Sequence, residues 1–355
     1  MINIPQKCLI TGGCGFLGSN IASHYLNQGS EVVVIDALLR EGGESNLRWL
    51  ENRDGGGAFT FIKGDLADYG MVESVFKKHG EFDYICHLGG QVAMTTSLSD
   101  PRRDMLTNVV GSFNVLEATR QYSPEAMVAY SSTNKVYGDL ENYTYEEKAT
   151  RYTVEGFASG FDESVSLDFA SPYGCSKGSA DQYVRDWSRN YGLSTVVFRH
   201  SSIYGGRQFS TVDQGWIGWF CRQAIEQARA KREGRPVTPF TISGTGKQVR
   251  DVLHAEDLIR LYDKAYQERE RVNGQIFNIG GGVENSLSLL ELFILLEKLT
   301  NQSPLKFEHL APRQSDQKVF IASIKKARKM LDWQPEVTAE KGIARMLQWV
   351  RQSTN

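Results

Sequence analysis

A tyrosine and a lysine lie four residues apart in the segment Ser171-Pro172-Tyr173-Gly174-Cys175-Ser176-Lys177. Side chains at this spacing share one face of a helix. A neighbouring ammonium favours the phenolate form of a tyrosine and lowers its pKa from the reference value of about 10. Tyr173 could then remove the proton of a hydroxyl group while the carbon that bears it loses a hydride. Surface pairs without function show the same spacing, so the assignment needs further residues.

A third residue suited to this chemistry is Thr133, in the segment Tyr130-Ser131-Ser132-Thr133-Asn134-Lys135-Val136-Tyr137-Gly138. The run 127–130 predicts a buried strand that leads into it. In an open parallel sheet the carboxyl ends of the strands face the ligand crevice. Thr133 could therefore hold the reacting hydroxyl group and help to relay its proton. By itself the Ser-Ser-Thr run is an ordinary strand end, and the combination with the other motifs makes it specific.

A glycine-rich turn lies between a predicted strand at 8–11 and a predicted helix at 16–28. Its glycines allow a tight turn, close approach of a pyrophosphate at the helix N-terminus, and close packing of helix on sheet. A carboxylate ends the next predicted strand, where it would accept from ribose hydroxyls and repel a 2′-phosphate, which favours NAD over NADP. A structural turn with a surface aspartate is the alternative. The residues expected at the cofactor are Gly12, Gly15, Phe16, Leu17, Gly18 and Asp36.

The segment Gly64-Asp65-Leu66 follows the third predicted strand. In a dinucleotide-binding domain, Asp65 could accept from the exocyclic amine of adenine while Leu66 packs on the ring. An ordinary helix N-cap explains the aspartate equally well, and without further context it is the better explanation.

The chain has 355 residues, 41% of them hydrophobic, and its 40 basic and 42 acidic residues give a net charge of −2. This length is typical of about two domains. The composition excludes whole-chain disorder and argues against nucleic acid as a partner. Five scattered cysteines and six histidines lack the spacing of a disulfide framework or a metal site. We therefore expect no bound metal. Because no signal peptide or long apolar run is present, we expect a cytoplasmic protein without a membrane partner.

Short β-branched runs alternate with amphipathic stretches through the first half of the chain. This alternation predicts an α/β fold, a Rossmann-like doubly wound parallel sheet with helices on both faces. We expect it to include a smaller, discontinuous α/β domain for the substrate. The predicted NAD-binding domain spans residues 1–200 and 239–270, and the predicted substrate domain spans residues 201–238 and 271–355. The polar loop 141–168 has no clear period, and loops of this size are often functional.

These motifs resemble the extended short-chain dehydrogenase/reductases, the NAD-dependent epimerases and dehydratases of nucleotide sugars. The resemblance covers essentially the whole chain. It is strongest to the members that epimerise a CDP-activated dideoxyhexose at carbon 2 through a transient 2-keto sugar. The segments that carry it are 87–97, 131–139, 171–183, 198–209, 213–220 and 242–258.

The resemblance implies a function for each matched position. Thr133, Tyr173 and Lys177 fall on the catalytic residues, and the last two also contact NAD. Further contacts to the cofactor are implied for Gln91, Asn108 and His200, the histidine near the nicotinamide. The CDP-sugar would contact Met94, Thr133, Ser202, Arg250 and Arg313. The two arginines would clamp its diphosphate, as a planar guanidinium can, although a solvated surface arginine is the alternative for each.

Two departures from the wider family bear on specificity. His200-Ser201-Ser202 stands where many relatives carry an aromatic-Phe-Asn sequence, which argues against a galactose-type epimerase. Asn134-Lys135 stands where the sugar dehydratases carry the Asp-Glu pair that eliminates water. An epimerase of another nucleotide sugar, or a non-catalytic NAD-sensing or RNA-binding relative, are the alternatives. The family also implies a homo-oligomer, formed through the predicted helices at 101–121 and 173–191.

Overall fold

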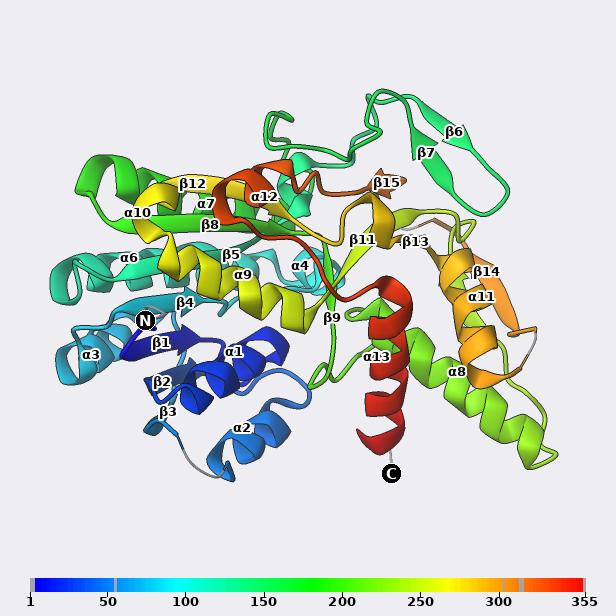
Figure 1. The fold of residues 1–355 in the computed structure, drawn as a ribbon, viewed down its shortest axis with the longest axis horizontal. Helices are drawn as coiled ribbons and strands as arrows, with labels where there is room; N and C mark the ends of the chain where they lie inside the picture. Colours follow the sequence, from blue (N-terminus) through cyan, green and yellow to red (C-terminus); the bar gives the residue numbers. More distant parts are fainter. Residues whose placement is uncertain (1–3, 54–55, 303, 313–315, 354–355) are drawn as a thin grey trace.

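The computed structural model describes residues 4–53, 56–302, 304–312 and 316–353 (Figure 1). At its centre lies a seven-stranded sheet in the order β12-β8-β5-β4-β1-β2-β3. All neighbouring strands in this sheet are parallel, which confirms the predicted doubly wound α/β fold. Its strands are β1 (Lys7–Thr11), β2 (Glu31–Asp36), β3 (Phe59–Lys63), β4 (Tyr84–His87), β5 (Met127–Thr133), β8 (Ser194–His200) and β12 (Gln275–Ile279).

Helices cover both faces of this sheet, because alternate residues of each strand point to opposite sides. Cys8 and Ile10 of β1 pack in one core, whereas Leu9 between them packs in the other. The first core includes α1 (Phe16–Asn27), α2 (Gly43–Glu51), α9 (Ala255–Gln267) and α12 (Lys325–Leu331). The second includes α3 (Tyr69–His79), α6 (Gly111–Tyr122) and α7 (Pro172–Tyr191).

A second group of elements lies beside the carboxyl ends of the central strands (Figure 1). Its core contains residues of three helices, α8 (Trp216–Arg232), α11 (Leu289–Thr300) and α13 (Ala339–Ser353). The strand β11 pairs with β9, β13 and β15, while β10 pairs with β14. These strands are β9 (Ser202–Tyr204), β10 (Phe240–Ser243), β11 (Val249–His254), β13 (Ser286–Ser288), β14 (Phe307–Leu310) and β15 (Val319–Phe320).

Three strands lie in a different sheet from the one that the predicted partition implies. β12 extends the central sheet beside β8, although residues 271–355 were assigned to the second domain. β10 pairs with β14, and β11 pairs with β9, β13 and β15, so both stay outside the central sheet, although residues 239–270 were assigned to the first domain. A short apolar run predicts a strand but does not reveal the partner of that strand. We propose a division that moves each of these three strands to the other unit.

The long loop 141–168 contains the hairpin of β6 (Tyr145–Glu147) and β7 (Tyr152–Val154), which projects beside β15 and β13 (Figure 1). Arg151 fixes it to α11 by an ion pair with Glu291, whose Oε1 accepts from Nε at 2.7 Å. Phe161, further along the loop, is fully buried and stacks on Phe320 of β15. The loop is therefore ordered by contacts with the second group of elements. No helix within the described ranges is long and apolar enough to cross a membrane.

Candidate active site

The glycine turn joins β1 to α1 at the carboxyl edge of the central sheet. Gly12 has a φ of +67°, and a Cβ atom there would lie 2.8 Å from the backbone of Gly89. At Gly18 a Cβ atom would lie 2.2 Å from the carbonyl oxygen of Gly12, so the fold itself requires both glycines. At Gly15 the nearest atom would be 3.2 Å away. A glycine at this position therefore leaves open the approach to the helix N-terminus, as binding of a pyrophosphate would require.

Asp36 lies at the end of β2, directly beside this turn. Its Oδ2 accepts from the backbone N–H of Cys14 at 2.9 Å, and its Oδ1 accepts from the backbone N–H of Leu38 at 2.8 Å. Burial raises the pKa of the carboxyl group, and these hydrogen bonds oppose that increase. Each oxygen keeps a further lone pair, so the carboxylate can still accept from ribose hydroxyls. Phe16 and Leu17 are half-buried at the start of α1.

Asp65 and Leu66 occupy the turn after β3. Asp65 is exposed, and its Oδ1 accepts from the backbone N–H of Ala67 at 3.0 Å. The N-cap of α3 is instead Asp68, whose Oδ1 accepts from Met71. Leu66 is buried beside Gly89 and Gly111. Asp65 therefore does not cap α3, so the explanation as a helix N-cap is wrong. Contact of either residue with adenine stays a prediction.

Tyr173 and Lys177 lie on the first two turns of α7, against the end of β5. The helix begins here because Ser171 caps it, accepting from the N–H of Gly174 at 3.1 Å, and because Pro172 suits the first helical position. The side chain of Thr133 lies close enough to the Tyr173 hydroxyl to influence its pKa. Lys177 Nζ donates to the carbonyl of Ser131 at 2.5 Å. The fold therefore brings together all three predicted catalytic residues.

The protonation of this pair differs from the sequence-based expectation. Burial raises the pKa of Tyr173 to about 12, and the interaction with Thr133 only partly opposes this. Burial also lowers the pKa of Lys177 to about 7. The amine is directed to the Ser131 carbonyl and the face of the Tyr130 ring, 4.3 Å from its centre. The predicted decrease of the tyrosine pKa is therefore wrong for the ligand-free protein.

Gln91 and Asn108 hydrogen-bond to each other beside α7. Asn108 lies in a π-helical turn, Leu106–Val110, that interrupts the predicted helix between α5 (Pro101–Met105) and α6. Its Oδ1 accepts from the backbone N–H of Gln91 at 2.8 Å, and its Nδ2 donates to Ser176 Oγ at 2.9 Å. π-Helical turns are frequent at functional sites. The two predicted residues therefore lie next to the Tyr173–Lys177 pair.

Sequence reasoning missed Asp104, which belongs to the same cluster. Its Oδ1 accepts from Gln91 Nε2 at 2.8 Å, and its Oδ2 accepts from the hydroxyl of Ser176. The side chain is fully buried. The available signal was its spacing, since Asp104 precedes Asn108 by four residues and so shares a helical face with it.

His200 lies opposite Thr133 in the register of β8 and β5. Its Nδ1 is 3.1 Å from the hydroxyl of Ser131, whereas its Nε2 is buried without a hydrogen-bond partner among the described residues. Burial lowers its pKa to about 3, so the ring is neutral at physiological pH. An unsatisfied buried nitrogen is costly, and a ligand group bound in the crevice could satisfy it.

The residues predicted at the substrate come from several elements. Met94 begins α4 (Met94–Ser99), and Ser202 Oγ accepts from the indole of Trp216 at 3.1 Å. The Arg250 side chain is only 14% exposed and forms an ion pair of 2.7 Å with Asp316, so it is not a solvated surface arginine. Arg313 lies outside the described residues. Their contact with a substrate stays a prediction.

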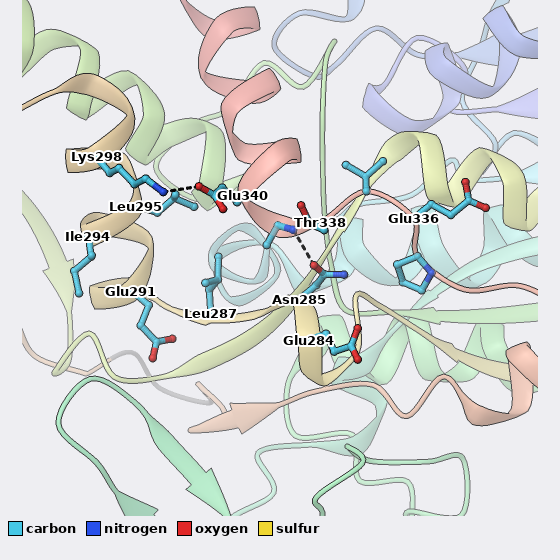
Figure 2. A pocket seen from close by; sticks show the side chains of 13 residues that line it. Glu284, Asn285, Leu287, Glu291, Ile294, Leu295, Lys298, Glu336, Thr338 and Glu340 are labelled. Atoms are coloured by element: carbon cyan, nitrogen blue, oxygen red, sulfur yellow. Dashed lines mark hydrogen bonds and ion pairs between the residues drawn. The ribbon is translucent and has the colours of Figure 1, made fainter.

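A cavity of about 560 Å³ opens elsewhere, between α11 and the segment that leads into α13 (Figure 2). Ion pairs or hydrogen bonds occupy several of its polar groups, such as Lys298 with Glu340 and Asn285 with the N–H of Ala339, each at 2.7 Å. None of the predicted site residues lines it.

Residues 9–346 match the family model described as GDP-mannose 4,6 dehydratase. The chain belongs to this family. Among curated members, a CDP-paratose 2-epimerase from Salmonella typhi is 54% identical over 97% of this chain and 99% of its own length. A dTDP-glucose 4,6-dehydratase from Neisseria meningitidis serogroup B is 31% identical over 97% of this chain and 93% of its own.

A solved structure supports the same assignment. The UDP-glucose 4-epimerase of Thermotoga maritima, determined with UDP-glucose, superimposes with a TM-score of 0.81 at 28% identity. The match covers 98% of this chain and 100% of that one. The proteins to which this chain is similar thus include both epimerases and dehydratases of nucleotide sugars. The residues of the site must therefore indicate which of these two reactions the chain favours.

The two residues after Thr133 bear on whether the chain favours epimerisation or dehydration. Asn134 Nδ2 donates to Gln317 Oε1 at 2.7 Å, which fixes the amide away from any acid–base role. Burial and the nearby Arg250 lower the pKa of Lys135 to about 8. The chain therefore places an amide and an amine, and no carboxylate, directly after the threonine. An acid–base pair of carboxylates for loss of water is missing at these two positions.

Proposed function

We propose that this protein epimerises a CDP-activated dideoxyhexose at carbon 2, converting CDP-paratose to CDP-tyvelose. The observation that carries this proposal is the 54% identity to a CDP-paratose 2-epimerase over nearly the full length of both chains. The intact Thr133, Tyr173 and Lys177 cluster supports catalysis over a non-catalytic NAD-sensing or RNA-binding function. Asn134 and Lys135 support epimerisation over dehydration.

The residues at the carboxyl edge of the sheet fit NAD. Gly12 and Gly18 allow the tight turn, Gly15 leaves the N-terminus of α1 open to a pyrophosphate, and Asp36 retains acceptor capacity for ribose hydroxyls. The orphan Nε2 of His200 needs a polar partner at the other end of the crevice. When bound, NAD supplies a group that can accept a hydride from a carbinol carbon and return it.

Thr133, Tyr173 and Lys177 have different functions in the proposed proton transfer. Thr133 lies beside the Tyr173 hydroxyl, so a sugar hydroxyl that contacts both can pass its proton to Tyr173 Oη. Burial holds the proton on the phenol at neutral pH. The Lys177 ammonium must therefore face the phenolate for the transfer to become favourable, and the two groups titrate as a coupled pair. The same oxygen returns the proton when the hydroxyl is restored.

Arg250 is the residue that best suits the diphosphate of the sugar nucleotide. It donates to two backbone carbonyls, those of Val249 and Gln317, and to Asp316, each at 2.7 Å. These bonds fix the guanidinium plane, which reduces the entropy lost when it binds an anion. We assign Met94 and Ser202 to the wall of the sugar site and Arg313 to the second diphosphate contact.

We further propose that the protein forms a homodimer through α6 and α7. Three aromatic side chains form an exposed cluster there, with Phe113 41%, Tyr183 40% and Tyr191 54% exposed. The rings of Phe113 and Tyr183 pack edge to face across the two helices. A second copy of the chain would cover this apolar face, and light scattering after size exclusion measures the resulting mass.

Incubation of the purified protein with CDP-paratose tests the proposed reaction. We expect a mixture of CDP-paratose and CDP-tyvelose, distinguished by the proton NMR couplings at carbon 2. Parallel reactions with dTDP-glucose and UDP-glucose test dehydration and epimerisation of other nucleotide sugars. Turnover of either of these substrates without turnover of CDP-paratose would overturn the proposal.

A further inference from the structure

Asp104 is a fully buried carboxylate at the start of the helix that leads to Asn108. Its two oxygens accept from Gln91 Nε2 and from the hydroxyl of Ser176, the residue directly before Lys177. Among the described residues no cation forms an ion pair with Asp104. Asp181 on α7, in contrast, accepts from Arg199 Nε at 2.9 Å and from Arg199 Nη2 at 2.8 Å. Asp104 is therefore a buried carboxylate whose hydrogen bonds come from neutral donors, and the nearby charge of Lys177 also favours its ionised form.

Such a group is expensive for a fold to keep. Burying a carboxylate without a counter-ion costs several kcal/mol, on the order of the whole net stability of many domains. Burial accordingly raises the pKa of Asp104, and its hydrogen bonds only partly oppose this. An apolar side chain at the same point of α5 would avoid the cost. Buried ionisable groups of this kind are concentrated at functional sites.

The charge of Asp104 acts on both members of the catalytic pair. It raises the pKa of Tyr173 and the pKa of Lys177. Asp181 also raises the pKa of Lys177, but its charge is balanced by Arg199. From the opposite side Arg40, in the loop after β2, lowers the pKa of Tyr173.

The remaining titratable groups near the pair are neutral. Lys177 and, above all, burial lower the pKa of His87 on β4 and that of His200 on β8 to about 3. Neither imidazole therefore carries charge at physiological pH. Asp104 is thus the buried anion near Tyr173 and Lys177 with which no arginine or lysine of the described chain forms an ion pair.

We propose that Asp104 is a positioning residue whose carboxylate orients Gln91 and Ser176 and supplies the fixed negative charge that sets the working pH of the Tyr173–Lys177 pair. It acts through its neighbours and need not touch the substrate. Gln91 also donates to the carbonyl of Ala93 at 2.7 Å, directly before Met94. One carboxylate thereby links the proposed sugar wall, the Asn108 turn and the first turns of α7.

The variant Asp104→Asn tests this role with little change of shape. The amide oxygen can still accept from Gln91, and the amide N–H can donate to Ser176 Oγ, whose own hydrogen can turn to the carbonyl of Tyr173 at 3.2 Å. Removing the negative charge of Asp104 makes Tyr173 and Lys177 easier to deprotonate. We therefore expect the pH profile of kcat for CDP-paratose to move to lower pH by about one unit, while KM changes less than kcat.

Asp257→Asn is the matched control. Asp257 is equally buried but lies on α9, where its oxygens accept from the backbone of Glu336 and Val337 and from Arg260. This variant should keep the wild-type position of the profile. Asp104→Glu retains a carboxylate and should restore the wild-type pH profile even where the longer side chain lowers kcat. A profile that does not move in Asp104→Asn, or moves equally in Asp257→Asn, overturns the proposal.

The pH profile of kcat rests on the proposed function, because it requires turnover of CDP-paratose. A second measurement therefore uses no substrate. In protein labelled with ¹³C at the lysine ε-carbon, the resonance missing from Lys177→Met identifies Lys177. Its titration midpoint should fall by about one unit in Asp104→Asn. If Asp104→Asn does not fold, Ser176→Ala takes its place, because it removes a hydrogen bond that stabilises the ionised form of Asp104. It should move the titration midpoint of Lys177 in the same direction by a smaller amount. An unchanged midpoint contradicts the inference, whereas inactive wild-type enzyme with a shifted midpoint contradicts only the proposed function.

Discussion

Arg207 donates from Nε to Oδ1 of Asn46 at 2.9 Å, joining the segment after β9 to α2. The amide of Asn46 in turn donates to the carbonyl of Cys14 at 3.0 Å and to that of Arg207 at 3.2 Å. The guanidinium also lies 4.6 Å from the centre of the Trp49 ring. Cys14 belongs to the glycine turn, so these bonds tie the second group of elements to the proposed cofactor site.

Breaking this connection should release NAD faster. Arg207→Ala removes a hydrogen bond from a charged donor and a cation–π contact, together about 1.5–3 kcal/mol. We expect the NAD content after prolonged dialysis to fall at a rate at least roughly tenfold higher than in wild type. The matched control is Arg269→Ala, which removes an arginine stacked on Tyr266 just before β12, at the amino end of the sheet. Equal loss of NAD from both variants would show that the Arg207–Asn46 bond does not retain it.

Tyr173→Phe should abolish most of the activity without loss of stability. The substitution keeps the ring and removes the hydroxyl oxygen that interacts with Thr133. Loss of a general base typically reduces kcat by about 10²- to 10⁴-fold. Tyr183→Phe on the exposed side of the same helix is the control and should remain within twofold of wild type. Turnover by Tyr173→Phe within a few-fold of wild type would exclude this tyrosine as the base.

Asp36 predicts that the purified protein carries NAD and not NADP. Its carboxylate already lies against the glycine turn, where a 2′-phosphate would meet a negative charge at close range. Acid denaturation followed by chromatography of the released nucleotide identifies the cofactor. Predominant NADP would refute the function assigned to Asp36.

The sequence predicted the parts of this protein that depend on local pattern. β1, β2, β4 and β5 follow from short apolar runs between turn signals, and the position of Thr133 at the end of β5 follows from the rule for parallel sheets. The spacing of Tyr173 and Lys177 correctly placed both on one face of α7. These features need no knowledge of which distant segments pair.

Features that depend on long-range contacts could not be predicted. The sheet that receives β10 or β12 depends on partners separated by many residues, Phe307–Leu310 and Ser194–His200 respectively. The pKa of Tyr173 depends on burial and on the direction of the Lys177 amine, and sequence spacing reveals neither. Asp104 resembled any surface aspartate near a helix start until the fold buried it against Ser176.

Asp251 should make the stability of the protein depend on pH. It lies in β11, and its Oδ2 accepts from the backbone N–H groups of Gly282 at 3.0 Å and Ala322 at 3.1 Å. Its Oδ1 is buried without a partner among the described residues. Burial raises the pKa of this carboxyl group to about 6, above its ordinary value of 3.8. The folded state therefore favours the protonated form more than the unfolded state does.

The sign of the effect follows from this difference. The stability that Asp251 contributes by holding a proton is fully present below pH 3.8 and is lost as the pH rises through about 6. Asp251→Asn cannot gain that contribution, because its amide does not titrate in this range. In urea unfolding, the stability of wild type relative to Asp251→Asn should therefore increase by about 1–2 kcal/mol between pH 7.5 and pH 5. A stability difference that stays constant over this interval, or decreases toward pH 5, would show that the carboxylate is solvated or paired in solution.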